Sequence, residues 1–396
     1  MIDDPRQLRF IVGTGRCGST LLSEMVRLHP EALSVSELFS FITDLGNLIP
    51  RCFPPGEIDG SEFLRVIAGP HPRQNQLLRH GLCMDEVIYP FSGPLAGSPS
   101  GPLAGSPSGP LAAGRHRMRD GDLPALLMAT LPHLSDDPDT AFDALTEAML
   151  ARPKAPIAEH YRALFTWLPT KLPREQPARV AVERSGGTLR IVARLLETFP
   201  EARFLHLVRD GRNTAISMSR HIGFRMALIG FQLLEFLGLD PYEDDSRDEV
   251  DDLPDELVHL LPENFSAEAF RSYDLSPALC GHYWSGEVQR GVELLSALPA
   301  DRLLTMRYED ILLSPRDSIA RIGTFLFDDA AAPVGIDPHW LTRATALVGR
   351  GRSAWQSLPP AERRELEDAC APGFAALAAH GLHWSDDHEK NRLAMG

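Results

Sequence analysis

Short apolar runs, most of them followed by a stretch of helical periodicity, set the hydrophobic pattern of this chain. Five runs have the length and composition of buried parallel strands: Leu8–Val12, Leu33–Val35, Arg179–Val182, Arg203–Val208 and Leu303–Met306. Helices are predicted after four of them, at Thr20–Leu28, Thr188–Thr198, Asn213 to about His221, and Pro315–Phe327. Such alternation is typical of a parallel sheet with helices on both faces. We therefore predict an α/β fold of three layers.

Two long segments, residues 40–175 and 222–300, interrupt this alternation and are predicted to be helices and loops that cover the site. We expect a single domain over residues 1–396. An eight-residue repeat lies in the first segment, where Gly93–Ser100 is followed by an identical Gly101–Ser108 and a partial third copy. Gly, Pro, Ala and Ser cannot bury a core, so residues 93–114 are predicted to be a flexible insertion without an assigned role.

Composition excludes several classes of protein. The net charge is −15 with no basic stripe to offset it, which disfavours nucleic acid as a partner. The longest apolar run, Met226–Leu239, contains Gln232 and Glu235 and is too short to span a bilayer, and the first strand begins too early to leave room for a signal peptide. Five scattered cysteines without metal-ligand spacing read as reduced thiols. These features predict a cytoplasmic enzyme.

A glycine-rich turn joins the first strand to the first helix. Gly13, Gly15 and Gly18 let the backbone approach an anion, and the amides of the following helix turn would point at it. Ser19 and Thr20 add hydroxyl donors. The spacing is close to that of nucleoside triphosphatase loops, but Ser19 stands where those loops have a lysine, and the cation Arg16 lies inside the loop. We predict a phosphate-binding turn whose ligand is not the nucleoside triphosphate of those loops.

The segment Thr14–Leu22 resembles the 5′-phosphosulfate loop of sulfotransferases that use 3′-phosphoadenosine 5′-phosphosulfate (PAPS). Arg209 at a strand end, with Ser217 eight residues later, resembles the 3′-phosphate motif of the same family. The resemblance implies a P-loop-like fold and a nucleotide site made by Gly15, Arg16, Cys17, Gly18, Ser19, Thr20, Arg209 and Ser217. For Cys17, a small residue that fits the loop is favoured over a thiol of lowered pKa.

Three further matches to the family lie later in the chain. Arg184 corresponds to a basic residue beside the sulfonyl group, although Gly186 stands where the family usually has proline. Tyr308 matches a tyrosine that contacts the nucleotide; alternatively, its segment only caps the next helix. Residues 349–355 partly match a basic loop over the 3′-phosphate and adenine, with Arg350 or Arg352 as the contact and Trp355 beside them.

Transfer to a hydroxyl needs a base, and we predict Glu37, which follows the second strand and so emerges at the same sheet edge as Arg16. Similar glutamates occur in several bacterial and protein-tyrosine sulfotransferases. The alternative is a glutamate that only stabilises the start of the next helix. His206 is read as a core histidine of a buried strand, and His221 as the reserve base.

The resulting hypothesis is a PAPS-dependent sulfotransferase that moves sulfonate in line to a hydroxyl and leaves 3′-phosphoadenosine 5′-phosphate (PAP), with Glu37, Arg16 and Arg184 as catalytic residues and no metal. The acceptor, a small molecule, lipid or natural product, is not defined by the sequence. The acidic run 240–256 holds ten carboxylates against one arginine and reads as a solvated loop, or else as a gate for cationic acceptors within the cover formed by 222–300. A P-loop kinase and a non-catalytic nucleotide-binding module are the alternatives.

Overall fold

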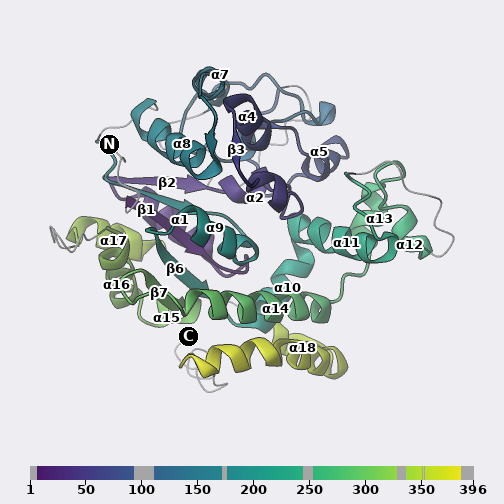
Figure 1. Cartoon of the computed structure of the whole chain (residues 1–396). Helices are drawn as coiled ribbons and strands as arrows, with labels where there is room; N and C mark the ends of the chain where they lie inside the picture. The colour runs from purple at the N-terminus through teal and green to yellow at the C-terminus, as the bar shows by residue number, and fades with distance from the viewer. Residues whose placement is uncertain are drawn as a thin grey trace.

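Five parallel strands form the centre of the molecule in the order β2-β5-β1-β6-β7. We describe a computed structural model of the chain over residues 7–92, 111–171, 176–243, 253–327, 336–349, 351 and 353–384. The strands are β1 (Leu8–Val12), β2 (Ala32–Ser36), β5 (Val180–Arg184), β6 (Arg203–Val208) and β7 (Leu303–Arg307). After β1, the chain forms β2 and β5 on one side of β1, and then β6 and β7 on the other side (Figure 1). Ligands of open α/β sheets bind at such a switch point, outside the carboxyl ends of the strands.

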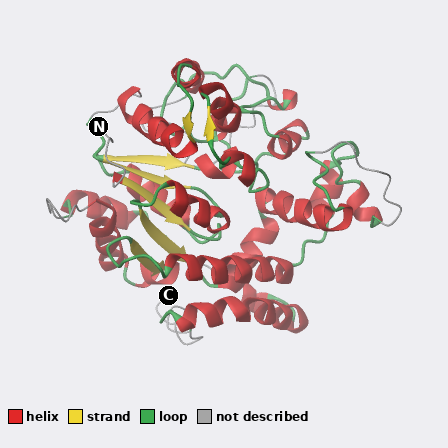
Figure 2. Ribbon diagram, in the orientation of Figure 1, coloured by secondary structure: helices red, strands yellow, loops and turns green. Residues whose placement is uncertain are grey.

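Helices cover both faces of the sheet because successive side chains of a strand point to opposite faces. Phe10 and Phe204 pack in one core with α9 (Val192–Thr198) and α8 (Ile157–Lys171). Ile11 and Leu205 pack on the other face, with α1 (Ser19–Arg27), α16 (Pro315–Phe327) and α17 (Pro338–Ala346). Figure 2 shows the strands enclosed by these helices. The predicted three-layer α/β fold is confirmed.

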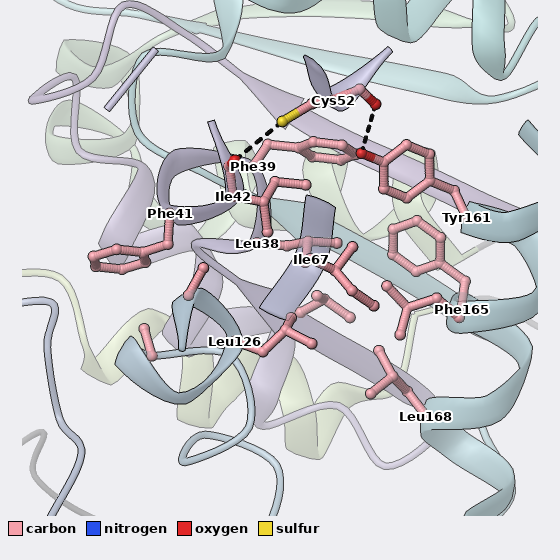
Figure 3. Close-up of a cluster of buried hydrophobic side chains, with 14 of the residues drawn as sticks. Leu38, Phe39, Phe41, Ile42, Cys52, Ile67, Leu126, Tyr161, Phe165 and Leu168 are labelled. Carbon is pink, nitrogen blue, oxygen red and sulfur yellow. Dashed lines mark hydrogen bonds between the residues drawn. The ribbon is translucent and has the colours of Figure 1, made fainter. Parts of the chain in front are cut away.

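A helical layer follows β2 and lies at the top of Figure 1. Its elements are α2 (Leu38–Ile42), α3 (Ile49–Cys52), the β3–β4 pair (Glu57–Ile58 and Ala155–Pro156), α4 (Gly60–Ala68), α5 (Pro72–Arg79), α6 (Ala125–Met128) and α7 (Pro138–Leu150). The Tyr161 hydroxyl donates to the carbonyl of Cys52 (2.9 Å), and the Cys52 thiol donates to the carbonyl of Ile42 (3.0 Å; Figure 3). Apolar packing and these bonds fix α2 directly after Glu37.

A second group of helices follows β6. It contains α10 (Gly211–Arg220), α11 (Ile222–Leu237), α12 (Asp255–Val258), α13 (Ala267–Ser272), α14 (Pro277–Leu295), α15 (Tyr308–Leu313) and α18 (Pro360–Ala379). Trp284 of α14 is fully buried between α10 and α18, where a Cβ on Gly211 or Gly373 would come within 2.5 Å of its ring. This packing holds α10, the helix that leaves β6, in a fixed place beneath the site.

Most differences from the predicted elements are at their ends. The third strand is Val180–Arg184 rather than Arg179–Val182, so Glu183 and Arg184 belong to the strand. The predicted helix Thr188–Thr198 is a 3₁₀ turn (Thr188–Ile191) followed by α9. Residues 93–110 of the repeat and 244–252 of the acidic run lie outside the described residues. Within the part of the chain that is described, no helix is long and apolar enough to cross a membrane.

Candidate active site at the carboxyl edge of the sheet

A cavity of about 320 Å³ lies where the five strands end, and every strand contributes a residue to its lining. Arg16 comes from the loop after β1, Glu37 follows β2, Arg184 ends β5, Arg209 follows β6, and Tyr308 follows β7. The carboxyl ends of parallel strands meet at one edge, which is why residues almost 300 positions apart converge here. The structure therefore brings these five motif residues together.

The loop after β1 has the backbone geometry of an anion-binding turn. Gly15 (φ 79°), Arg16 (φ 53°) and Gly18 (φ 96°) are left-handed, a conformation that glycine adopts without strain. A Cβ on Gly15 would overlap the Phe224 ring, and one on Gly18 would overlap Tyr308. In the described structure, α1 starts without a side-chain cap or an acidic residue in its first turn. The amides of its first turn and the helix dipole thus favour an external anion here.

Hydrogen bonds join this loop to the motif after β6. Arg16 donates from Nε to the Ser217 hydroxyl (3.2 Å), and Arg209 donates from Nη1 to the backbone carbonyl of Arg16 (3.0 Å). The Arg209 guanidinium also lies over the Tyr308 ring, 5.2 Å from its centroid. The two predicted phosphate motifs are therefore physically connected, with Tyr308 packed between them.

Glu37 and Arg184 form a buried ion pair on the β5 side of the cavity. Oε1 of Glu37 accepts from Arg184 Nη1, and Oε2 accepts from the Ser40 hydroxyl (2.5 Å) and the amide of Gly186 (2.9 Å). Glu37 stands at the start of α2 with φ 58°, and its side chain makes no cap hydrogen bond there. Burial lowers the pKa of Arg184 to about 10, which leaves it charged at neutral pH.

Glu86 and His221 complete the polar wall, and sequence reasoning missed Glu86. Its Oε1 pairs with Arg16 Nη1 (3.2 Å), and its Oε2 accepts from His221 Nε2 (3.0 Å). Burial alone would raise the pKa of Glu86, but the hydrogen bond from His221, the charge of His221 when it is protonated, and the charge of Arg16 lower it to about 2. In neutral His221 with its proton on Nε2, Nδ1 accepts from the amide of Phe224 (3.3 Å). Glu86 comes from the layer after β2, and no local motif marks it.

The remaining predicted site residues differ in their relation to the cavity. Ser19 is buried, Thr20 is exposed, and both line the cavity. Cys17 is fully buried, and burial raises its pKa, so its thiol is neutral and it acts as a small residue that fits the loop. Arg350 and Arg352 lie outside the described residues. Trp355 packs on Arg212, 3.8 Å from its guanidinium, and is not among the residues that line the cavity.

Electrostatically, the cavity is a positive site in an acidic protein. The described lining holds four arginines (Arg16, Arg184, Arg190 and Arg209) against two glutamates (Glu37 and Glu86). The whole chain carries a net charge of −15. Burial of such an excess of guanidinium groups is costly unless anions offset it. The lining therefore favours an anionic ligand.

Comparison with known proteins finds a family match over part of the chain. Residues 127–266 match the model of the sulfotransferase family. This stretch contains β5, β6 and α10, and with them Arg184, Arg209 and Ser217. The resemblance to sulfotransferases is thereby confirmed, and the match indicates sulfonate transfer as the general class of reaction. Among curated proteins, none matches the sequence.

Solved structures with a related arrangement are also sulfotransferases. The sulfotransferase domain from the curacin biosynthetic pathway is 15% identical, with 93% of this chain and 98% of that chain covered and a TM-score of 0.41. A sulfotransferase from Alicyclobacillus acidocaldarius is 14% identical, with 97% and 98% covered and a TM-score of 0.38. One from Mycobacterium avium is 15% identical, with 95% and 77% covered and a TM-score of 0.41.

Proposed function

We propose that this protein transfers the sulfonate group of PAPS to a hydroxyl of an acceptor and releases PAP. The observation that carries the proposal is the connection between two phosphate-binding motifs in one positive cavity: Arg209 bonds the backbone of Arg16, and Arg16 bonds Ser217. A 5′-phosphosulfate and a 3′-phosphate on one nucleotide need two such groups close together. The sulfotransferase family match over residues 127–266 supports the same conclusion.

Each motif has a proposed role toward PAPS. The loop residues Gly15, Cys17 and Gly18 offer backbone amides, with Ser19 and Thr20 as hydroxyl donors, to the 5′-phosphosulfate. Arg209 and Ser217 bind the 3′-phosphate, and Tyr308 packs against the nucleotide. Late arginines at 350 and 352 remain predicted contacts to that phosphate. When bound, PAPS supplies a sulfuryl group whose leaving group is a phosphate.

The transfer itself is proposed as one in-line step. The acceptor oxygen forms a bond to sulfur while the bond between sulfur and the bridging phosphate oxygen breaks, and PAP leaves with that electron pair. The acceptor proton passes to Glu37. Arg16 and Arg184 stabilise the negative charge that develops on the leaving phosphate and the sulfuryl oxygens. No covalent intermediate with the enzyme is required.

The hydrogen bonds of Glu37 suit a base. An ionised carboxylate has about four acceptor positions, and the donors Arg184, Ser40 and Gly186 take three of them. These bonds fix the orientation of the carboxylate and leave one lone pair for an acceptor hydroxyl. His221 lacks this freedom, because Nδ1 accepts from Phe224 and Nε2 donates to Glu86. Glu37 is therefore the preferred base.

Calorimetric titration with PAP and with ATP tests the proposal. PAP should bind tightly, because it presents phosphates to both motifs, and ATP should bind weakly or not at all because it has no 3′-phosphate. Tight binding of ATP together with weak binding of PAP would favour the kinase alternative. Binding of PAP without sulfate transfer to any hydroxyl compound would favour the non-catalytic module.

A further inference from the structure

Arg190 is a cation of the cavity that the mechanism above does not use. It lies in the 3₁₀ turn after β5 and lines the cavity, and no carboxylate forms an ion pair with it among the described residues. Its guanidinium lies over the Phe231 ring of α11, 4.2 Å from the centroid. On the other side is Gly46, where a Cβ would come within 2.6 Å of Nη1. Arg190 is thus held between an aromatic face and a glycine backbone.

The loop that contains Gly46, on one side of Arg190, is held in a fixed conformation. Asp44 (φ 47°), Leu45 (φ 61°) and Gly46 (φ 94°) are three consecutive left-handed residues, a strained run that persists only where its surroundings fix it. The buried carboxylate of Asp44 accepts from the amides of Arg73 (3.1 Å) and Gln74 (3.2 Å) and pairs with the Arg73 guanidinium. These bonds to the start of α5 therefore hold in place the loop that contains Gly46 and packs against Arg190.

The nearest polar neighbours of Arg190 do not neutralise it. Burial raises the pKa of Glu287 in α14 to about 7, and the charge of Arg190 lowers this pKa by less than burial raises it. One carboxyl oxygen of Glu287 is buried without a hydrogen-bond partner in the described structure. Tyr283 forms a hydrogen bond with Arg190, but burial raises the pKa of its phenol, so Tyr283 stays neutral and does not offset the charge. The positive charge of Arg190 is left for a ligand in the cavity.

A row of aromatic rings separates Arg190 from the phosphate loop. Phe224 lies against Gly15, its ring is 6.3 Å from that of Tyr283, and Tyr283 is 6.5 Å from Phe231, which carries Arg190. Phe224 and Tyr283 line the same cavity as Glu37. The lining of this one cavity therefore combines the reactive groups Glu37 and Arg16, a set of aromatic rings and the Arg190 guanidinium.

We propose that Arg190 binds an anionic group of the acceptor, so that the natural substrate is a hydroxylated carboxylate with an apolar body. The proposal rests on the sulfotransferase function. A guanidinium matches a carboxylate with two parallel hydrogen bonds, and its stacking on Phe231 pre-orients that fork. The apolar body lies along the aromatic row, which leaves the hydroxyl at the end where Glu37 and Arg16 lie.

Matched pairs of acids and amides test the assignment. A series of ω-hydroxy fatty acids, from hexanoic to dodecanoic, is compared with the corresponding primary amides for binding to the PAP complex by calorimetry and for sulfation with PAPS. At neutral pH each acid differs from its amide mainly in charge. At the length that spans the cavity, the acid should bind about 10–100-fold more tightly, as expected for charged hydrogen bonds. R190Q should lower the affinity for that acid to the level of its amide.

Two controls isolate the role of Arg190. R194Q removes an exposed arginine of α9 that pairs with Glu197, and it should keep the preference for acids. E287Q tests whether Arg190 only serves as a counter-ion, in which case both R190Q and E287Q would lower the melting temperature without changing the preference. That result would overturn the assignment. A wild type that shows no preference for the acid at any length, or that binds neither the acids nor the amides, would overturn it as well. Loss of PAP binding by the wild type would instead contradict the sulfotransferase proposal.

Discussion

The two sides of β1 treat charge differently. On the β5 side, Arg184 and Glu37 are buried and form an ion pair, and Ser40 and Gly186 are further donors to the Glu37 carboxylate. On the β6 side, Arg209 bonds only a backbone carbonyl and lies over the Tyr308 ring, without an ion pair in the described chain. The closed side holds a reactive group in one orientation. The open side keeps its positive charge available for a ligand.

This difference separates the two tasks of a transferase. A base needs a fixed geometry, because proton transfer requires close approach of the acceptor. A cation that binds a nucleotide must instead exchange its temporary partners for phosphate oxygens. Arg16 stands between the two sides, since it bonds Ser217 of the open side and Glu86 at its margin.

The largest expected effect is on the rate, at the closed side. If Glu37 takes the acceptor proton, E37Q should lower the sulfation rate by about 10²–10⁴-fold, the usual contribution of a general base, and leave PAP affinity nearly unchanged. The wild-type rate should also fall at acidic pH as the carboxylate takes up a proton, and E37Q should lack this limb. Steady-state rates across pH and calorimetry with PAP provide the test.

S40A is the matched control for E37Q, because it removes one donor to the carboxylate and keeps the carboxylate itself. Its rate should fall far less. Gln at position 37 also leaves Arg184 without its anion, so rates must be compared well below the melting temperature of each variant. If E37Q retains a near-normal rate and an unchanged acid limb, the base is another group.

The second effect is on stability. R184M leaves the Glu37 carboxylate buried without its cation, and breaking one partner of a buried pair typically costs about 3–5 kcal/mol. R209M on the open side should lower the free energy of unfolding much less, because Arg209 forms no ion pair with a carboxylate in the described structure. Chemical unfolding of both variants measures the contrast. Equal losses would show that the two sides do not differ as described.

A smaller effect concerns acid stability at Glu86. Its folded pKa of about 2 lies below the ordinary value of 4.5, so the ionised carboxylate stabilises the fold by about 3 kcal/mol above pH 4.5. This contribution is lost as the pH falls from about 4.5 to 2. E86Q should be less stable at neutral pH, and the difference from the wild type should shrink as the pH falls. A difference that stays constant with pH would mean that Glu86 stabilises by packing alone.

Much of the sheet and part of the site could be predicted from local patterns. The apolar runs at Leu8–Val12 and Arg203–Val208 have the bounds of β1 and β6, because buried parallel strands leave a strong, short apolar signal. Arg16, Glu37 and Arg209 follow strands, so their convergence at one edge followed from the parallel arrangement.

The partners of these residues could not be predicted in the same way. Glu86 and Arg190 reach the cavity only through the packing of the layer after β2 and of α11, and neither lies in a phosphate-binding motif. The pairing of Glu37 with Arg184 depended on the end of β5, which the apolar pattern placed two residues too early. Charged residues at the end of a buried strand interrupt the apolar signal although the strand continues.

The most direct test of the account is a calorimetric cycle with PAP and AMP, two nucleotides that differ in the 3′-phosphate, on the wild type and R209A. The wild type should bind PAP more tightly than AMP, and R209A should lose about 1.5–3 kcal/mol with PAP and almost nothing with AMP, the size expected for charged hydrogen bonds to one phosphate. Equal affinity of the wild type for PAP and AMP, or equal losses with both nucleotides in R209A, would contradict the proposal that the open side of β1 binds the 3′-phosphate of PAPS.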